Sequence, residues 1–154
     1  MGKKASSKDA ELILKLYELR REPELRKARD WWLWTFSPLT ADDFLKVAGA
    51  SGSQENNWLR QGGSYWGMAA ALVRQGLLDE ELFLRPACSG EMFFIFAKIQ
   101  PYLKEFREAT NNPNAFSHIE QVATRSKTAR KHLERVSKNI QGRLKAMAKS
   151  GKKG

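Results

Sequence analysis

The chain is 154 residues long, 42% hydrophobic and rich in aromatic residues (five Trp and eight Phe), which predicts one folded domain and excludes a disordered chain. Its single cysteine excludes an internal disulfide, and its longest apolar run, residues 92–97, is far shorter than the ~18 residues of a membrane span. The net charge of +10 lies entirely in the last thirty residues. Residues 1–124 hold 16 basic and 16 acidic side chains, whereas residues 125–154 hold 11 basic residues and one acid, Glu134.

Two helices are predicted at the N-terminus. Ser6–Asp9 fits a capping box, and the apolar residues that follow at three- and four-residue spacing predict a helix over residues 8–22. Pro23 suits the first turn of a second helix, because a missing N–H costs nothing there. We expect that helix to end at Pro38.

A short helix and a long one follow. Thr40 opens a capping box for a helix that ends near Gly49, and apolar periodicity predicts a helix over residues 55–75. Gly63 and Gly67 lie four residues apart on the long helix, a spacing that lets another element approach closely. The surrounding segment is not a phosphate loop, because it lacks a Lys-Ser/Thr ending and a preceding strand.

The second half of the chain is also helical. Residues 79–81 supply acidic side chains to the start of a short helix, and Ser89 can cap the next one, which Pro101 should kink or split. Asn111–Asn114 is the clearest linker. Beyond it we predict one long amphipathic helix that frays after about Lys149.

No segment alternates with the two-residue period of a β-strand, so the predicted fold class is all-α. We expect an irregular helical bundle of six to seven helices with a long basic amphipathic C-terminal helix. The uneven distribution of charge predicts two units, which are a neutral helical domain over residues 1–124 and a basic helical tail over residues 125–154.

The basic tail has two interpretations. One is contact with nucleic acid or another polyanion, where each neutralised phosphate releases counterions. The other, which we weight more heavily, is a helix whose apolar stripe packs on the body and whose charges are merely solvated. No aromatic residue lies beyond Phe116, so there is no stacking platform for single-stranded nucleic acid, and a membrane-surface role is also weakened. The candidate polyanion-binding residues are Lys127, Arg130, Lys131, Arg135, Lys138, Lys145 and Lys149.

Three tryptophans form a second candidate surface. On a helix, Trp31, Trp32 and Trp34 span an arc of about 160°, wider than the stripe that a helix buries against one neighbour. One of them at an exposed position would mark a partner surface. The alternative is a wide face buried between two neighbouring helices.

No catalytic constellation is visible. Cys88 precedes a predicted helix start, a place that lowers a thiol pKa, but His118 and His132 both lie on the last helix and nothing places either beside it. The two histidines are about 21 Å apart along a helix and cannot share a metal. We therefore expect no enzyme, no cofactor, no metal and a structural thiol, in a cytoplasmic protein.

Several segments resemble an uncharacterised bacterial family of small all-helical proteins, over about residues 8–120. They are residues 14–21, 64–73, 76–83, 90–92 and 98–107. The resemblance implies a helical fold, carries no activity or catalytic residue, and leaves out the basic tail.

These observations favour a non-enzymatic helical module that binds a protein partner or a second copy of itself. The alternative function is nucleic-acid or polyanion binding through the basic C-terminal helix.

Overall fold

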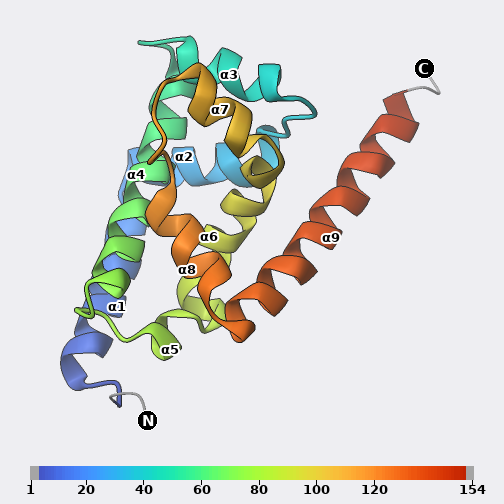
Figure 1. Cartoon of the computed structure of the whole chain (residues 1–154). Helices are drawn as coiled ribbons and strands as arrows, with labels where there is room; N and C mark the ends of the chain where they lie inside the picture. The colour runs from blue at the N-terminus through green and yellow to red at the C-terminus, as the bar shows by residue number, and fades with distance from the viewer. Residues whose placement is uncertain (1–3, 152–154) are drawn as a thin grey trace.

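A computed structural model describes residues 4–151, which form an all-α fold without strands and confirm the predicted class. Figure 1 shows α1 to α8 gathered into a bundle, from which the long α9 diverges along one side. In chain order the elements are α1 (Ser7–Arg20), α2 (Pro23–Asp30), the π-helix η1 (Trp31–Thr35), α3 (Ala41–Gly49), α4 (Gln54–Arg74), α5 (Glu80–Phe83), α6 (Pro86–Ile99), the 3₁₀ turn η2 (Gln100–Tyr102), α7 (Leu103–Ala109), α8 (Ser117–Arg125) and α9 (Lys127–Gly151). In the described part of the chain no helix combines the length and apolar character that crossing a membrane requires.

Local sequence signals set the start of α1 and α3, as predicted. The hydroxyls of Ser6 and Thr40 accept the N–H of Asp9 and Asp43, and each of those carboxylates in turn accepts the N–H of its cap residue. Asp9 also reaches across the fold, because its Oδ1 accepts the N–H of Asp79 at 2.8 Å and so ties α1 to the start of α5.

The second predicted helix changes type in its middle. It is α-helical only to Asp30 and continues as a π-helix, closed by the N–H of Phe36 donating to the carbonyl of Trp31 at 2.8 Å. The wider π turn places one more residue per turn than an α-helix. This register turns Trp31 and Trp32 into the core and leaves Trp34 outside.

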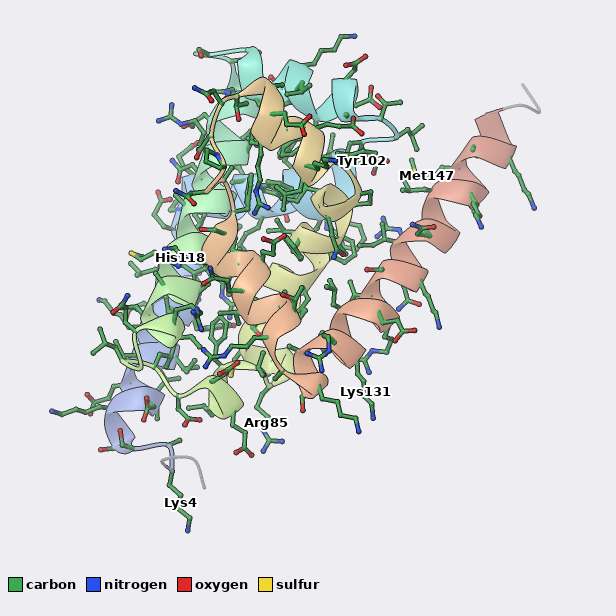
Figure 2. All side chains as sticks on the ribbon, viewed as in Figure 1. Lys4, Arg85, Tyr102, His118, Lys131 and Met147 are labelled. Carbon is green, nitrogen blue, oxygen red and sulfur yellow. The ribbon has the colours of Figure 1, made fainter. Side chains whose placement is uncertain are left out.

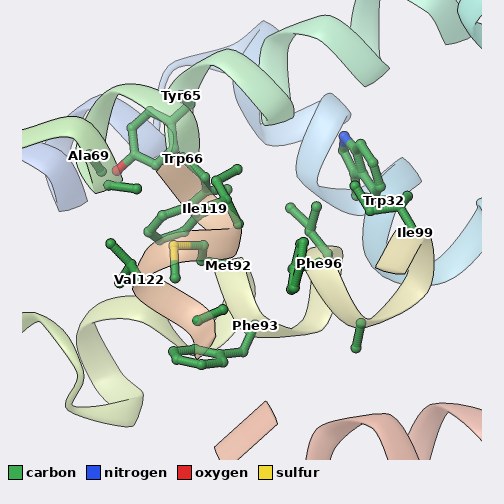
Figure 3. Close-up of a cluster of buried hydrophobic side chains, with 14 of the residues drawn as sticks. Trp32, Tyr65, Trp66, Ala69, Met92, Phe93, Phe96, Ile99, Ile119 and Val122 are labelled. Carbon is green, nitrogen blue, oxygen red and sulfur yellow. The ribbon is translucent and has the colours of Figure 1, made fainter. Parts of the chain in front are cut away.

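Helix α4 lies against α2 and α8, and its glycines do not all serve the predicted purpose. The closest approach is at Gly62, where an added Cβ would meet the indole of Trp32, and Gly63 similarly faces Phe116. Gly67 has nothing within 4 Å, so its predicted role in close packing is wrong. Figure 3 shows Trp32 and Trp66 within the buried cluster to which α4, α6 and α8 contribute.

Helix α6 begins at Pro86, four residues earlier than a cap at Ser89 predicts, and Pro86 occupies the first turn as prolines favour. Ser89 is therefore not a cap: it lies inside α6, fully buried, and its hydroxyl has no hydrogen-bond partner. Pro101 splits this region as predicted, because it sits in η2 between α6 and α7.

The predicted last helix is two helices. Ser126 is extended, with φ −99° and ψ 157°, and separates α8 from α9. The apolar stripe continues across this break, which is why periodicity alone did not reveal it. Helix α9 runs to Gly151, two residues beyond the predicted fraying point, and Lys152 and Lys153 of the predicted tail lie outside the described residues.

Candidate functional site

The start of α9 is fixed to the bundle by hydrogen bonds and apolar packing. The Ser126 hydroxyl accepts the N–H of Ala129 at 3.0 Å, and the guanidinium of Arg130 donates to the carbonyls of Thr124 and Arg125 at 3.1 and 3.0 Å. Ala129, Leu133 and Ile140 are buried against the bundle, where α9 packs on α6 and α8. Arg130, a predicted polyanion ligand, therefore has a structural task at the end of α8.

The opposite face of α9 carries a row of exposed cations, which we call the basic row. At ~100° per residue its members fall within an arc of about 80°, and at ~1.5 Å per residue the row is about 33 Å long. Figure 2 shows Lys131 on the side of α9 that points away from the bundle. The basic row comprises Lys127, Lys131, Arg135, Lys138, Lys145 and Lys149.

The basic row has almost no intramolecular counter-ions. Within the described chain, its one ion pair joins Lys138 to Glu134 at 3.5 Å in the same helix, and no carboxylate of the bundle reaches it. Arg135 contacts the Nδ1 atom of His132 at 3.2 Å, and the His132 ring packs on Phe93 with centroids 4.5 Å apart. Burial, followed by the charge of Arg135, lowers the pKa of His132, so this histidine adds little charge at neutral pH.

The inner face of α9 encloses a groove near its outer end, which we call the α9 groove. It lies between α9, the end of α6 and the segment that follows η1. The enclosed space is only about 10 Å³, room for about one water molecule. Its lining residues are Ser37, Pro38, Phe94, Lys98, Ile140, Arg143, Leu144 and Met147.

Lys98 lines the α9 groove and is buried, and no carboxylate of the described residues pairs with it. Its Nζ donates to the carbonyls of Trp32, Phe36 (2.6 Å) and Leu33 (3.4 Å), which the chain leaves open where η1 ends. Burial, and secondarily the charge of Arg143, lowers the pKa of Lys98 to about 8. Because its three donors are all used, Lys98 acts as a cap that holds η1 against α6.

Arg143 lies at the mouth of the α9 groove and also lacks an acidic partner. Its guanidinium stacks over the rings of Trp34 and Phe94, 5.4 and 5.7 Å from their centroids. In residues 4–151 it makes no ion pair with any carboxylate. Two large apolar side chains here are exposed: Trp34 (68%), which lies under Arg143, and Met147 (55%), which lines the groove.

The three tryptophans that were predicted to form a partner surface differ in their exposure. Trp31 and Trp32 are 5% and 0% exposed, so their assignment to a partner surface is wrong. Trp31 stacks on Phe36 with centroids 4.6 Å apart, and the indole N–H of Trp32 donates to the carbonyl of Trp58 at 3.2 Å. Only Trp34 is available to a partner, as the wide arc on the helix suggested for one of the three.

The other cluster of ionisable groups is internal. Glu91 of α6 accepts both Nε and Nη2 of Arg29, and Arg20 lies 4.0 Å from the same carboxylate. Burial is the main cause of a raised pKa at both Cys88 and Tyr65, which reaches about 12 in Tyr65. A raised thiol pKa is the reverse of what a nucleophilic cysteine needs. This cluster therefore holds α1, α2 and α6 together and does not resemble a catalytic site.

The family model described as "Domain of unknown function (DUF4760)" matches residues 5–126. The chain belongs to the DUF4760 family. No curated protein and no solved structure matches the chain.

The segment that matches the DUF4760 model contains only part of the candidate surfaces. It includes Trp34, Phe94 and Lys98, whereas Arg143 and the whole basic row lie beyond its last residue, Ser126. Sequence reasoning missed Lys98 and Arg143 as members of one site. The only signals were Lys98 at the end of an apolar run and Arg143 beside the apolar stripe of α9, and neither indicates the contact between them.

Proposed function

We propose that this protein is a non-enzymatic module that binds nucleic acid through the basic row of α9. The observation that carries the proposal is the charge of the segment from Arg125 to Lys149, which has nine basic residues and one acid and, within residues 4–151, forms no ion pair with the bundle. A row of cations without counter-ions neutralises phosphates and releases their counterions, which favours binding. The single cysteine, Cys88, fits the reducing bacterial cytoplasm, where nucleic acids are accessible.

The length of α9 supports binding over simple solvation. Packing on the bundle accounts for α9 as far as Met147: Ile140 is its last buried residue, Leu144 is partly buried and Met147 lines the groove. The helix nevertheless continues to Gly151 and carries Lys145 and Lys149, which support nothing in the bundle. A ligand along the exposed face would give that extension a role.

The test compares two variants of equal charge. One replaces Lys131, Lys138, Lys145 and Lys149 of the basic row by Gln, and the control replaces four exposed lysines of the bundle by Gln. Fluorescence anisotropy of a labelled duplex, titrated between about 50 and 200 mM salt, measures both affinity and its salt dependence. The control lysines are Lys8, Lys15, Lys46 and Lys104.

We expect the row variant to bind more weakly than the control. The slope of log affinity against log salt should also become shallower by about 0.9 for each lost contact to duplex DNA. Equal affinity and equal slope in the two variants would show that net charge alone, and not the basic row, attracts the nucleic acid. The proposal then fails.

The second candidate function is protein–protein interaction or self-association. Trp34 favours it, because its indole is 68% exposed and lies under Arg143, at the mouth of the groove that the exposed Met147 lines. Sedimentation velocity over a range of concentrations tests self-association, which the substitution Trp34→Ala should weaken. A chain that stays monomeric throughout leaves only a different protein as the partner.

A further inference from the structure

Two cations meet at the α9 groove without an anion between them. Lys98 is 7% exposed, and Arg143 is near enough to contribute to its lowered pKa. Among the described residues, none that lines the groove is acidic. The remaining lining is apolar apart from Ser37. An unpaired positive charge at an apolar surface attracts an anionic ligand, because the Coulomb attraction is screened less there than in bulk water.

We propose that the α9 groove binds an acidic segment of a partner protein, which places a carboxylate on Arg143 and an apolar side chain against Trp34 and Met147. The proposal rests on the second candidate function above, protein–protein interaction, and specifies that the partner presents an acidic segment with an apolar side chain.

Arg143 is prepared for a carboxylate. Its guanidinium lies over the rings of Trp34 and Phe94 and, within residues 4–151, forms no ion pair, so its N–H groups can meet a bidentate acceptor. Stacking also limits the conformations of a long side chain, which lowers the entropy lost on binding. Lys98 contributes positive potential from the floor of the groove and does not contact the ligand, because carbonyls occupy its Nζ.

The shape of the site favours a protein segment. The enclosed space of about 10 Å³ is too small for an organic molecule, so a ligand must lie across the surface. Met147 in the lining and Trp34 under Arg143 provide exposed apolar area, which suits side chains of a segment laid over the groove.

Nucleic acid would meet a different face of the helix. Arg143 lies roughly 130° around α9 from the middle of the basic row, on the side of the bundle. A substitution at Arg143 can therefore be separated from the effect of the basic row. Lys145 gives the matched control, since it is two residues away, exposed on the outer face, and loses the same charge when replaced by Gln.

The experiment uses the full chain and a displayed library of random peptides as the probe. Enriched peptides are synthesised and titrated against four proteins: the parent chain, Arg143→Gln, Lys145→Gln and Trp34→Ala. Thermal unfolding of each variant checks that the fold is unchanged. Duplex binding by Arg143→Gln is measured in parallel.

We expect enriched peptides to carry Asp or Glu next to Leu, Phe or Trp. Arg143→Gln should weaken their binding about tenfold or more, the loss typical of a charged hydrogen bond. Lys145→Gln should change it less than about twofold, Trp34→Ala should weaken it, and duplex binding by Arg143→Gln should remain near that of the parent.

Two results would overturn the proposal in different ways. If the peptides bind Arg143→Gln as tightly as the parent but do not bind Trp34→Ala, the groove binds protein segments but does not select acidic ones. If no peptide is enriched, or if none of the enriched peptides depends on Trp34, the groove is not a docking site for a partner segment. Sedimentation velocity then decides separately whether the protein self-associates.

Discussion

Gly62→Ala should destabilise the protein, because Gly62 faces the indole of Trp32. A Cβ on Gly62 would lie 2.6 Å from Cδ1 of Trp32 and closer still to Nε1. The ring has little freedom to retreat, since it is fully buried and sits 5.5 Å from the Trp31 ring and 5.2 Å from the Phe36 ring. Its N–H bond to the carbonyl of Trp58 would be strained by any shift.

The magnitude follows from three contributions to the free energy of unfolding. Overpacking a core costs about 1–3 kcal/mol, and a weakened indole hydrogen bond costs up to about 1 kcal/mol. The better helix propensity of Ala returns about 1 kcal/mol. The net loss is about 2 kcal/mol, which corresponds to a drop of roughly 4–8 °C in Tm for a chain of this size.

The assay is urea unfolding followed by tryptophan fluorescence, with Gly67→Ala as the control. Gly67 lies on the same helix with nothing within 4 Å, so its replacement should stabilise by up to about 1 kcal/mol through propensity alone. If both alanine variants prove equally stable, the close approach of Trp32 to α4 is not a constraint and the reasoning is refuted.

Three further predictions concern charges and caps. The pKa of Lys98 is about 8 in the fold against 10.5 unfolded, so the unfolded chain binds more protons between these values and stability should rise with pH across this window. This increase in the free energy of unfolding is at most about 3 kcal/mol. It is measured by urea unfolding of the parent and of Lys98→Met at pH 7.5–10.5, because subtracting the two pH profiles removes the contribution of all other titrating groups. Glu91→Gln should cost about 2 kcal/mol, since it leaves Arg29 and Arg20 partly buried without an anion, whereas equal stability would show that the cluster is dispensable. Thr40→Ala should cost about 1 kcal/mol through loss of the α3 cap, with amide exchange accelerated in the first turn of α3 and unchanged in α4.

Local signals in the sequence were enough to predict part of the fold. The capping boxes at Ser6 and Thr40 specify hydrogen bonds within four residues, so composition at those positions sufficed. The exposed face of α9 was also predictable, because periodicity fixes which side chains share a side. The same argument suggested one tryptophan outside the core, although it could not say that Trp34 was the one.

Long-range contacts explain what the sequence did not predict. The carbonyls that Lys98 caps lie more than sixty residues earlier in the chain, at the end of a π-helix that no local pattern indicates. The break at Ser126 escaped notice because the apolar stripe stays in phase across it. The stacking of Arg143 on Trp34 depends on the angle at which α9 leaves the bundle, which is a tertiary property.

Ile140 is the last buried residue of α9, and beyond it the helix is held only by the partly buried Leu144 and by groove contacts such as that of Arg143 with Trp34. From Ile140 to Gly151 the helix extends about 16 Å without a fully buried side chain. A tilt of about 5° at Ile140 would move the tip by about 1.4 Å, while Lys131, close to the anchored start, would hardly move. Bending of α9 therefore leaves the beginning of the basic row in place but moves the helix wall of the α9 groove. The width of the groove thus depends on the bending of a single helix.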